Sequence, residues 1–264
     1  MDIIIFGGQS NMQGQTECLP EDNIPVQGAL EYRYKTNELI PLQHPVGEDL
    51  RGEKWCAAAH LGHGCVVPAF CRAYTKQSGR EVIAIHAAKG NTVLGDWMHG
   101  TQHAYHARRK IKSGIEKAKE LGKIDHIYYV WLQGESDALI HTGEEEYLQR
   151  LIEYKNQLKT QFGIEKFGII KVGYYLANCS WNLNPNDTEE DKIAYNENIM
   201  RAQERAVEED EDFIMLTRVC AGLSRNQVYI NPQAEGHYNN AAMEIIGKEA
   251  GKTLANNVKE RRYE

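Results

Sequence analysis

The sequence predicts an α/β protein in which helices cover both faces of a mostly parallel sheet. Short apolar runs alternate along the chain with longer amphipathic runs. Near-continuous runs of Ile, Val, Tyr and Phe are typical of strands that are buried on both faces, as parallel sheets require. The regular alternation of strand and helix therefore favours a doubly wound, three-layer α/β/α sandwich.

Five segments have the composition of strands, because each is rich in Ile, Val, Tyr or Phe and is flanked by breakers or polar residues. They are residues 3–6, 82–86, 127–132, 167–175 and 213–217. The proline-bearing stretch 16–60 interrupts this order. It contains a candidate strand at 30–34 and a turn at 35–37, and we expect it to run over the sheet as a long excursion rather than to form a second domain.

Amphipathic helices fit between these strands, because apolar residues recur there at helical spacing. Asp187 and Glu190 have the spacing of a capping box at a helix start. The apolar positions of the expected helices are Ile111, Ile115 and Ala118; Leu148, Leu151, Ile152 and Leu158; Ile193, Met200 and Val207; and Ala242, Ile246, Ala250, Leu254 and Val258.

Length and composition favour one soluble domain spanning residues 1–264. The chain has 264 residues, 42% of them hydrophobic, and a net charge of -7. This charge favours neither nucleic acid nor an anionic membrane as a partner. We expect a cytoplasmic protein with reduced cysteines, because the N-terminal apolar run is too short for an export signal and the six cysteines follow no disulfide framework. A homo-oligomer stays open.

Four polar, glycine-bearing turns follow the ends of predicted strands or precede the last helix. They are residues 7–12, 88–92, 133–137 and 233–237. Ligands bind beyond the carboxyl ends of the strands in an open parallel sheet, so these turns predict an active site.

Acyl transfer needs a nucleophile, a base and donors for the oxyanion. Ser10 follows two glycines that permit a tight bend, and His237 has an imidazole that titrates near neutral pH. The backbone N–H groups of Ser10 and Gly90 and the side-chain amide of Gln133 are candidate oxyanion donors. A serine in a turn and a histidine before a helix are also common as capping or surface residues.

These turns resemble sequence blocks of the SGNH-hydrolase superfamily, in the branch of sialate O-acetylesterases and acetylxylan esterases of carbohydrate esterase family six. The resemblance covers residues 3 to about 250. The matching segments are Gly8-Gln9-Ser10-Asn11-Met12, Gly62-His63-Gly64-Cys65, Gly90-Asn91-Thr92-Val93-Leu94-Gly95-Asp96-Trp97, Trp131-Leu132-Gln133-Gly134-Glu135-Ser136-Asp137 and His237-Tyr238.

The resemblance implies a flavodoxin-like α/β/α fold and an acyl-serine mechanism without a metal or other cofactor. It implies Ser10 as nucleophile, His237 as base, and Gly90 and Gln133 as oxyanion donors. Gln9 is a candidate substrate-binding residue.

Two departures from the family pattern bear on the site. Asn91 stands where a second glycine is common, and Ala234 stands where the family places an Asp that orients the histidine. The expected substitute is Glu235, with Glu135 and a backbone carbonyl as alternatives. Glu135 could equally bind substrate or support the structure.

Several other patterns invite weaker interpretations. Cys56, His60, His63 and Cys65, or His99, His103 and His106 on one helix face, could hold zinc, but neither set has a standard finger spacing. The basic run at 108–112 is expected to be the solvated face of a helix rather than a nucleic-acid site. Trp97 and Trp181 are candidate sugar platforms, and for Trp97 core packing is the alternative.

The sequence therefore predicts a serine esterase that removes O-acetyl groups from a small or oligomeric carbohydrate, of the acetylated xylo-oligosaccharide or sialic acid type. Two alternatives stay open. One is a carbohydrate-binding protein on an esterase scaffold that has lost activity, and the other is a lipid esterase or thioesterase of the same superfamily.

Overall fold

Seven strands form one sheet in the order β3-β2-β4-β1-β5-β6-β7. The structure is a computed structural model that describes residues 1–48, 64–177, 184 and 186–260. All neighbouring strands pair in parallel except β2 and β3, which are antiparallel. The strands are β1 Asp2–Gly8, β2 Ala29–Arg33, β3 Glu38–Pro41, β4 Val82–Ala88, β5 His126–Leu132, β6 Lys166–Ile170 and β7 Phe213–Thr217.

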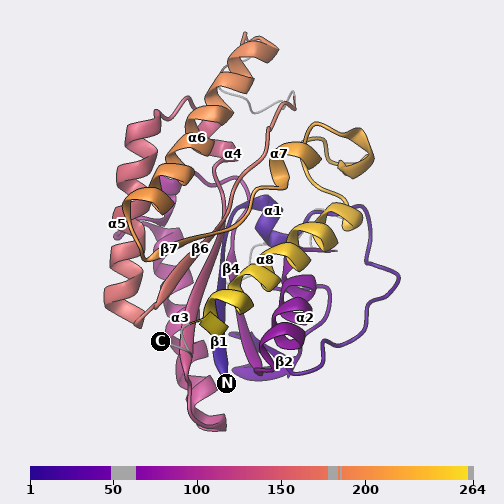
Figure 1. The fold of residues 1–264 in the computed structure, drawn as a ribbon, viewed down its shortest axis with the longest axis vertical. Helices are drawn as coiled ribbons and strands as arrows, with labels where there is room; N and C mark the ends of the chain where they lie inside the picture. Colours follow the sequence, from indigo (N-terminus) through magenta and orange to yellow (C-terminus); the bar gives the residue numbers. More distant parts are fainter. Residues whose placement is uncertain (49–63, 178–183, 185, 261–264) are drawn as a thin grey trace.

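Helices cover both faces of the sheet, which confirms the predicted three-layer α/β/α sandwich. Two long helices pack side by side on one face, and three long helices lie on the other (Figure 1). The first pair is α2 Val66–Ser78 and α8 Asn240–Glu260, and the second group is α3 Gln102–Leu121, α5 Glu144–Phe162 and α6 Glu189–Glu209. The short helices are α1 Ser10–Gln13, α4 Glu135–Leu139, α7 Cys220–Leu223, η1 Leu94–Trp97 and η2 Gln227–Tyr229.

The centre of the sheet is strand β1, and every one of its seven residues is buried. Phe6 packs edge-on against Phe70 of α2, with ring centroids 5.2 Å apart. On the opposite face, Trp131 packs against Trp97 and Tyr154, at 5.6 and 5.1 Å. Each such side chain contributes about 1.5–3 kcal/mol through burial, so packing on both faces stabilises the centre of the sheet.

The predicted strand 167–175 is too long, because β6 ends at Ile170. The Lys171 N–H still donates to the Thr217 carbonyl of β7 at 3.0 Å, but after it three backbone N–H groups donate to side chains instead of to a neighbouring strand. The pairs are Val172 N–H to Gln203 Oε1 at 3.0 Å, Tyr174 N–H to Ser224 Oγ at 2.9 Å and Tyr175 N–H to Asn196 Oδ1 at 3.1 Å. The segment therefore leaves the sheet and crosses toward the rim.

Two further expectations need correction. The excursion expected to run over the sheet instead extends its edge, because β2 pairs with β4 and β3 pairs with β2. The capping box lies one residue later than predicted: the Thr188 hydroxyl accepts from the Asp191 N–H at 3.2 Å, and the Asp191 carboxylate accepts from the Thr188 N–H at 3.0 Å.

The basic run at 108–112 is not a wholly solvated helix face. Lys110 is fully buried, and its Nζ lies 3.1 Å from Glu48 Oε2. Within the ranges that the structure describes, no helix is both long and apolar enough to cross a membrane.

Candidate active site

The candidate nucleophile lies at the point where β1 turns into α1. Gly8 has φ 143, and a Cβ there would lie 2.0 Å from the Leu132 carbonyl oxygen, so only glycine fits. Ser10 is the first residue of α1 and is 4% exposed. Among the described residues, neither the Ser10 N–H nor the Asn11 N–H meets a hydrogen-bond acceptor. These N–H groups at a helix start suit a developing negative charge.

The turn that follows β4 lies directly beside Ser10. A Cβ atom at Gly90 would lie 3.4 Å from the Ser10 Cβ and 2.8 Å from Gln13 Oε1, so any larger residue would fill this space. The Gly90 N–H donates to Gln13 Oε1 at 2.7 Å. This candidate oxyanion donor is therefore present, but it must exchange its bond with Gln13 for one to the substrate. Asn91 has φ 57, a conformation that Asn tolerates better than most residues, which explains why it replaces glycine.

The other predicted oxyanion donor, Gln133, is fully buried and already bonded. Its Nε2 lies 2.6 Å from Asp137 Oδ2, 3.0 Å from the Thr92 carbonyl and 3.2 Å from Gln9 Oε1. Its Oε1 accepts from the Tyr147 hydroxyl at 3.1 Å. In this structure Gln133 therefore joins the turns to one another rather than presenting an open donor.

Gln9 has a similar role. Its Oε1 also accepts from the Ser136 N–H at 3.1 Å, which ties the turn that carries Ser10 to the start of α4. Gln9 is buried, with 3% of its surface exposed. The structure thus brings Gln9 to the site as a support for the nucleophile turn.

Two carboxyl groups of the middle turn are buried. Burial raises the pKa of Asp137 to about 6, against hydrogen bonds from Gln133, the Leu94 N–H and Thr142 that favour its charged form. Burial also raises the pKa of Glu135, while the side-chain amide of Asn11 lowers it. Glu135 Oε1 accepts from Asn11 Nδ2 at 2.7 Å, and Oε2 has no hydrogen-bond partner among the residues described.

The histidine loop docks on the nucleophile turn through Asn11. The Oδ1 of Asn11 accepts from the Tyr238 N–H at 3.2 Å, while its Nδ2 donates to Glu135. A second tie is the bond from Asn231 Nδ2 to the Gln15 carbonyl at 2.6 Å. Asn11, the residue after Ser10, thus links the nucleophile turn with the middle turn and with the residue after His237. The motif contains Asn11, but the sequence does not reveal this bridging role.

The imidazole of His237 is oriented by backbone groups. Its Nδ1 lies 3.2 Å from the carbonyl oxygens of both Ala234 and Glu235. Carbonyls only accept, so Nδ1 carries the proton and Nε2 has the lone pair that a base requires. The Glu235 side chain is exposed. The contacts at Nδ1 are thus of the third predicted kind, with backbone carbonyls.

Tyr175 forms the wall beside His237. Its ring packs edge-on against the imidazole, with centroids 5.9 Å apart. The buried side chain of Asn196 on α6 bonds both polar groups of the Tyr175 backbone. It accepts from the N–H at 3.1 Å and donates to the carbonyl at 3.4 Å. Neither residue was predicted, because a lone Asn on a polar helix carries no sequence signal of such a contact.

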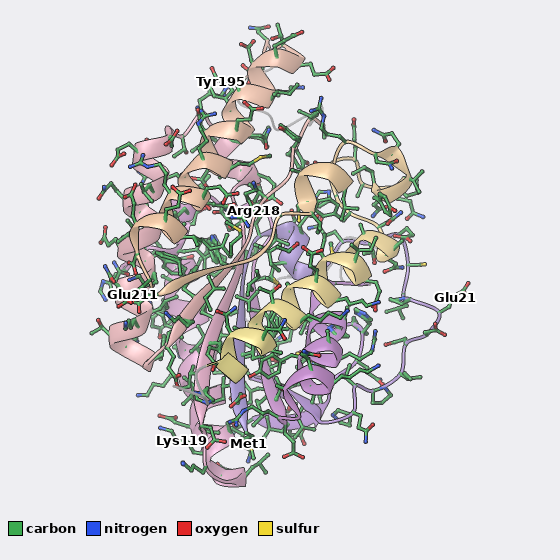
Figure 2. The ribbon with its side chains drawn as sticks, in the orientation of Figure 1. Met1, Glu21, Lys119, Tyr195, Glu211 and Arg218 are labelled. Atoms are coloured by element: carbon green, nitrogen blue, oxygen red, sulfur yellow. The ribbon has the colours of Figure 1, made fainter. Side chains whose placement is uncertain are left out.

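A stacked pair holds α6 against the end of α4. Tyr195, labelled on the projecting end of α6 in Figure 2, stacks on His141 with centroids 3.6 Å apart. His141 Nε2 also lies 2.8 Å from Asp187 Oδ2. These contacts fix the helix that carries Asn196.

The predicted sugar platforms are not assembled in the described part of the site. Trp97 is fully buried, with its Nε1 bonded to Thr92 Oγ1 at 3.0 Å, so it packs in the core. Trp181 lies outside the described residues.

The described residues give no support to either candidate zinc site. Cys56, His60 and His63 lie outside the described residues, and His99 precedes α3 and so does not share its face. In the described ranges, no three His, Cys, Asp or Glu side chains are placed to hold a metal ion.

The sequence of this chain matches one family of known proteins. Residues 1–224 match the family described as carbohydrate esterase, sialic acid-specific acetylesterase, and the chain therefore belongs to this esterase family. No curated protein matches the chain significantly.

Three solved structures share the fold. A protein from Arabidopsis thaliana has 19% identity and a TM-score of 0.71, with 97% of this chain and 98% of that one covered. NanS has 15% identity and a TM-score of 0.65, covering 98% of both chains. A carbohydrate acetylesterase from Xanthomonas citri has 15% identity and a TM-score of 0.54, covering 97% of this chain and 57% of that one. At these identities the likeness concerns the fold alone.

Proposed function

We propose that this protein is a serine esterase that removes O-acetyl groups from carbohydrates, of the acetylated xylo-oligosaccharide or sialic acid type. The observation that carries the proposal is the bridge made by Asn11. This side chain connects the turn of Ser10 with the loop of His237. Its bond partner Tyr238 lies 227 residues further along the chain.

In the proposed reaction, Ser10 Oγ attacks the acetyl carbonyl and its proton passes to His237 Nε2. The Ser10 and Gly90 N–H groups donate to the oxyanion of the tetrahedral intermediate. As the C–O bond to the sugar breaks, His237 returns the proton to the sugar oxygen. Water, activated by His237, then attacks acetyl-Ser10 and releases acetate.

The carbonyls of Ala234 and Glu235 support this proton transfer, because they hold the tautomer whose Nε2 can accept. They carry partial charge only, so they stabilise an imidazolium less than a carboxylate would. Glu135 adds a carboxyl group to the far side of Asn11, where it positions the bridge rather than touching His237.

The test compares acetate release from p-nitrophenyl acetate, acetylated xylo-oligosaccharides and O-acetylated sialic acid for wild type, Ser10→Ala and Ser136→Ala. Ser136 is a matched control, since its buried Oγ has no hydrogen-bond partner among the described residues. We expect Ser10→Ala to lower the rate at least about 10³-fold and Ser136→Ala to leave it near wild type. Loss of activity in Ser136→Ala alone would move the nucleophile to Ser136.

If the wild type releases acetate from none of the three substrates, the proposal is wrong, and a carbohydrate-binding scaffold becomes the better interpretation. Preference between the two carbohydrate substrates, expressed as kcat/KM, would identify the sugar class.

A further inference from the structure

A groove of about 1300 Å³ lies between α3 and α5, away from Ser10. One wall is formed by Thr101 and by α3 as far as Lys112, and the other is α5 from Gln149 to Gln161. Both helices begin near the carboxyl ends of the strands (Figure 1), and η1 packs against both of them. None of the residues that line this groove belongs to the candidate active site.

The groove is basic, although the chain as a whole has a net charge of -7. Its lining contains one carboxylate, that of Glu153, and four cationic side chains, which are Arg108, Arg109, Lys112 and Arg150. Arg150 pairs with Glu146 at 2.6 Å, and Lys112 lies 4.0 Å from Glu116. A local excess of positive charge therefore remains, and it centres on the two adjacent arginines.

Arg108 has no carboxylate partner in the described part of the chain. Its guanidinium donates to two neutral amide oxygens, Gln157 Oε1 at 2.7 Å and Gln161 Oε1. Its Nε is buried and has no hydrogen-bond partner among the same residues. A guanidinium held by neutral groups keeps its full charge available for an anion.

Arg109 lies beside two aromatic rings. Its guanidinium carbon is 5.4 Å from the Tyr105 ring centroid and 5.8 Å from that of Tyr34, and its Nη1 donates to the Tyr105 hydroxyl at 3.2 Å. Tyr105 is 57% exposed. An exposed aromatic ring beside an arginine presents an apolar face and a charged donor to the same ligand.

Polar side chains complete the lining. They supply both donors and acceptors for hydroxyl groups, and they are Gln102, Gln149, Asn156, Gln157, Thr160 and Gln161. The volume exceeds the roughly 300–1,000 Å³ of a pocket for one small molecule, so the groove suits a ligand of several linked rings.

We propose that this groove is a second, non-catalytic binding site for an oligosaccharide that carries carboxylates. Arg108 and Arg109 bind the carboxylates, Tyr105 packs against a sugar ring, and the amides bind hydroxyl groups. The proposal rests on the proposed function for the choice of a carbohydrate ligand, but its charge requirement comes from the groove alone.

The experiment uses Ser10→Ala protein, so that no ester is hydrolysed during the measurement. Isothermal titration calorimetry at low salt compares tetragalacturonate with its fully methyl-esterified form, which keeps the rings and removes the charges. We expect tetragalacturonate to bind and the methyl ester to bind at least about tenfold more weakly, because charged hydrogen bonds to arginine are lost. Affinity for tetragalacturonate should fall as salt is raised.

Arg109→Gln in this background should weaken tetragalacturonate binding about tenfold or more. Arg201→Gln is the matched control, since it removes one exposed arginine from α6, outside the groove, and should leave the affinity unchanged. Arg108→Gln should act like Arg109→Gln, with the melting temperature measured because Arg108 bridges the two helices.

Three results would overturn the proposal: no binding of tetragalacturonate, equal binding of the methyl ester, or equal weakening by Arg201→Gln. Equally tight binding of an oligonucleotide of the same charge would assign the groove to polyanions in general. Acetate release by wild-type protein tests the proposed function separately, so failure of one leaves the other distinguishable.

Discussion

The two sides of the candidate site are built differently. On the nucleophile side, the side chains of Gln9, Asn11 and Gln133 are buried and bonded to one another or to neighbouring turns. On the histidine side, His237 is partly exposed, and its Nδ1 faces backbone carbonyls at 3.2 Å. One side is part of the sheet's rim, whereas the other is a loop that docks on it.

This difference teaches where each kind of substitution should act. Changes on the nucleophile side remove partners from buried polar groups, so they should lower both stability and activity. Changes to exposed side chains of the histidine loop should leave stability unchanged, and they should affect activity only where they move the imidazole.

The largest expected effect on stability is that of Gln133→Ala. The change removes the donor to Asp137 Oδ2 and Gln9 Oε1, two buried acceptors. We expect a loss of about 3 kcal/mol in the free energy of unfolding, measured by urea denaturation, together with reduced acetate release. Gln149→Ala removes an exposed amide and should change stability by less than about 0.5 kcal/mol. Similar small losses for both variants would show that the network contributes little.

An effect of similar size, reached only at low pH, is expected from a buried histidine beneath the nucleophile turn. Burial lowers the pKa of His86 to about 4, with Lys110 and Arg33 adding to the decrease, while bonding to the Met12 carbonyl and the charge of Glu48 oppose it. The unfolded chain takes up this proton near pH 6.5 and the folded chain only near pH 4. Stability is therefore fully present above pH 6.5 and is lost as pH falls toward 4, by up to about 3 kcal/mol.

Urea denaturation between pH 4.5 and 7.5 tests this expectation. His86→Gln should flatten the dependence of unfolding free energy on pH, without abolishing it, because burial also lowers the pKa of His44 to about 4. An unchanged pH dependence in His86→Gln would contradict the assignment to His86.

The smallest effect, and the sharpest comparison, comes from two glutamates. Glu235→Gln should change kcat by less than about twofold, because its carbonyl and not its exposed side chain faces His237. Glu135→Gln keeps an acceptor for Asn11 and removes only the charge, and should lower kcat about tenfold. A loss near 10³-fold or more in Glu235→Gln would instead identify its carboxylate as the orienting acid during catalysis.

Much of the fold follows from patterns that are local in sequence. The strands at 3–6, 82–86, 127–132 and 213–217 are confirmed, because their apolar runs pack in the sheet, largely buried in the first three and half-buried in part of the edge strand β7. The helix that begins with three glutamates at Glu144 is also confirmed. Its signal is local too, since negative charge is favourable at the N-terminal end of a helix.

What the sequence could not reveal depends on partners distant in the chain. Residues 171–175 look like strand, yet side chains from α6 and the residue after α7 accept the N–H groups of Val172, Tyr174 and Tyr175. The sequence around Lys110 predicts a solvated position, yet Lys110 is buried and forms an ion pair with Glu48. The same holds for His237, whose orienting carbonyls belong to the backbone and leave no residue signature.

Because the Gly90 N–H donates to Gln13 Oε1, the Gln13 side chain competes with the acyl oxygen of a substrate for this donor. A neutral ester carbonyl is an acceptor of similar or lower strength than an amide oxygen, so it gains little by displacing Gln13. An oxyanion is a far stronger acceptor and displaces it readily. For a Gly90 that serves the oxyanion, this occupant leaves the ester with little to gain from the N–H, so the hydrogen bond to the acyl oxygen forms mainly as negative charge develops in the transition state.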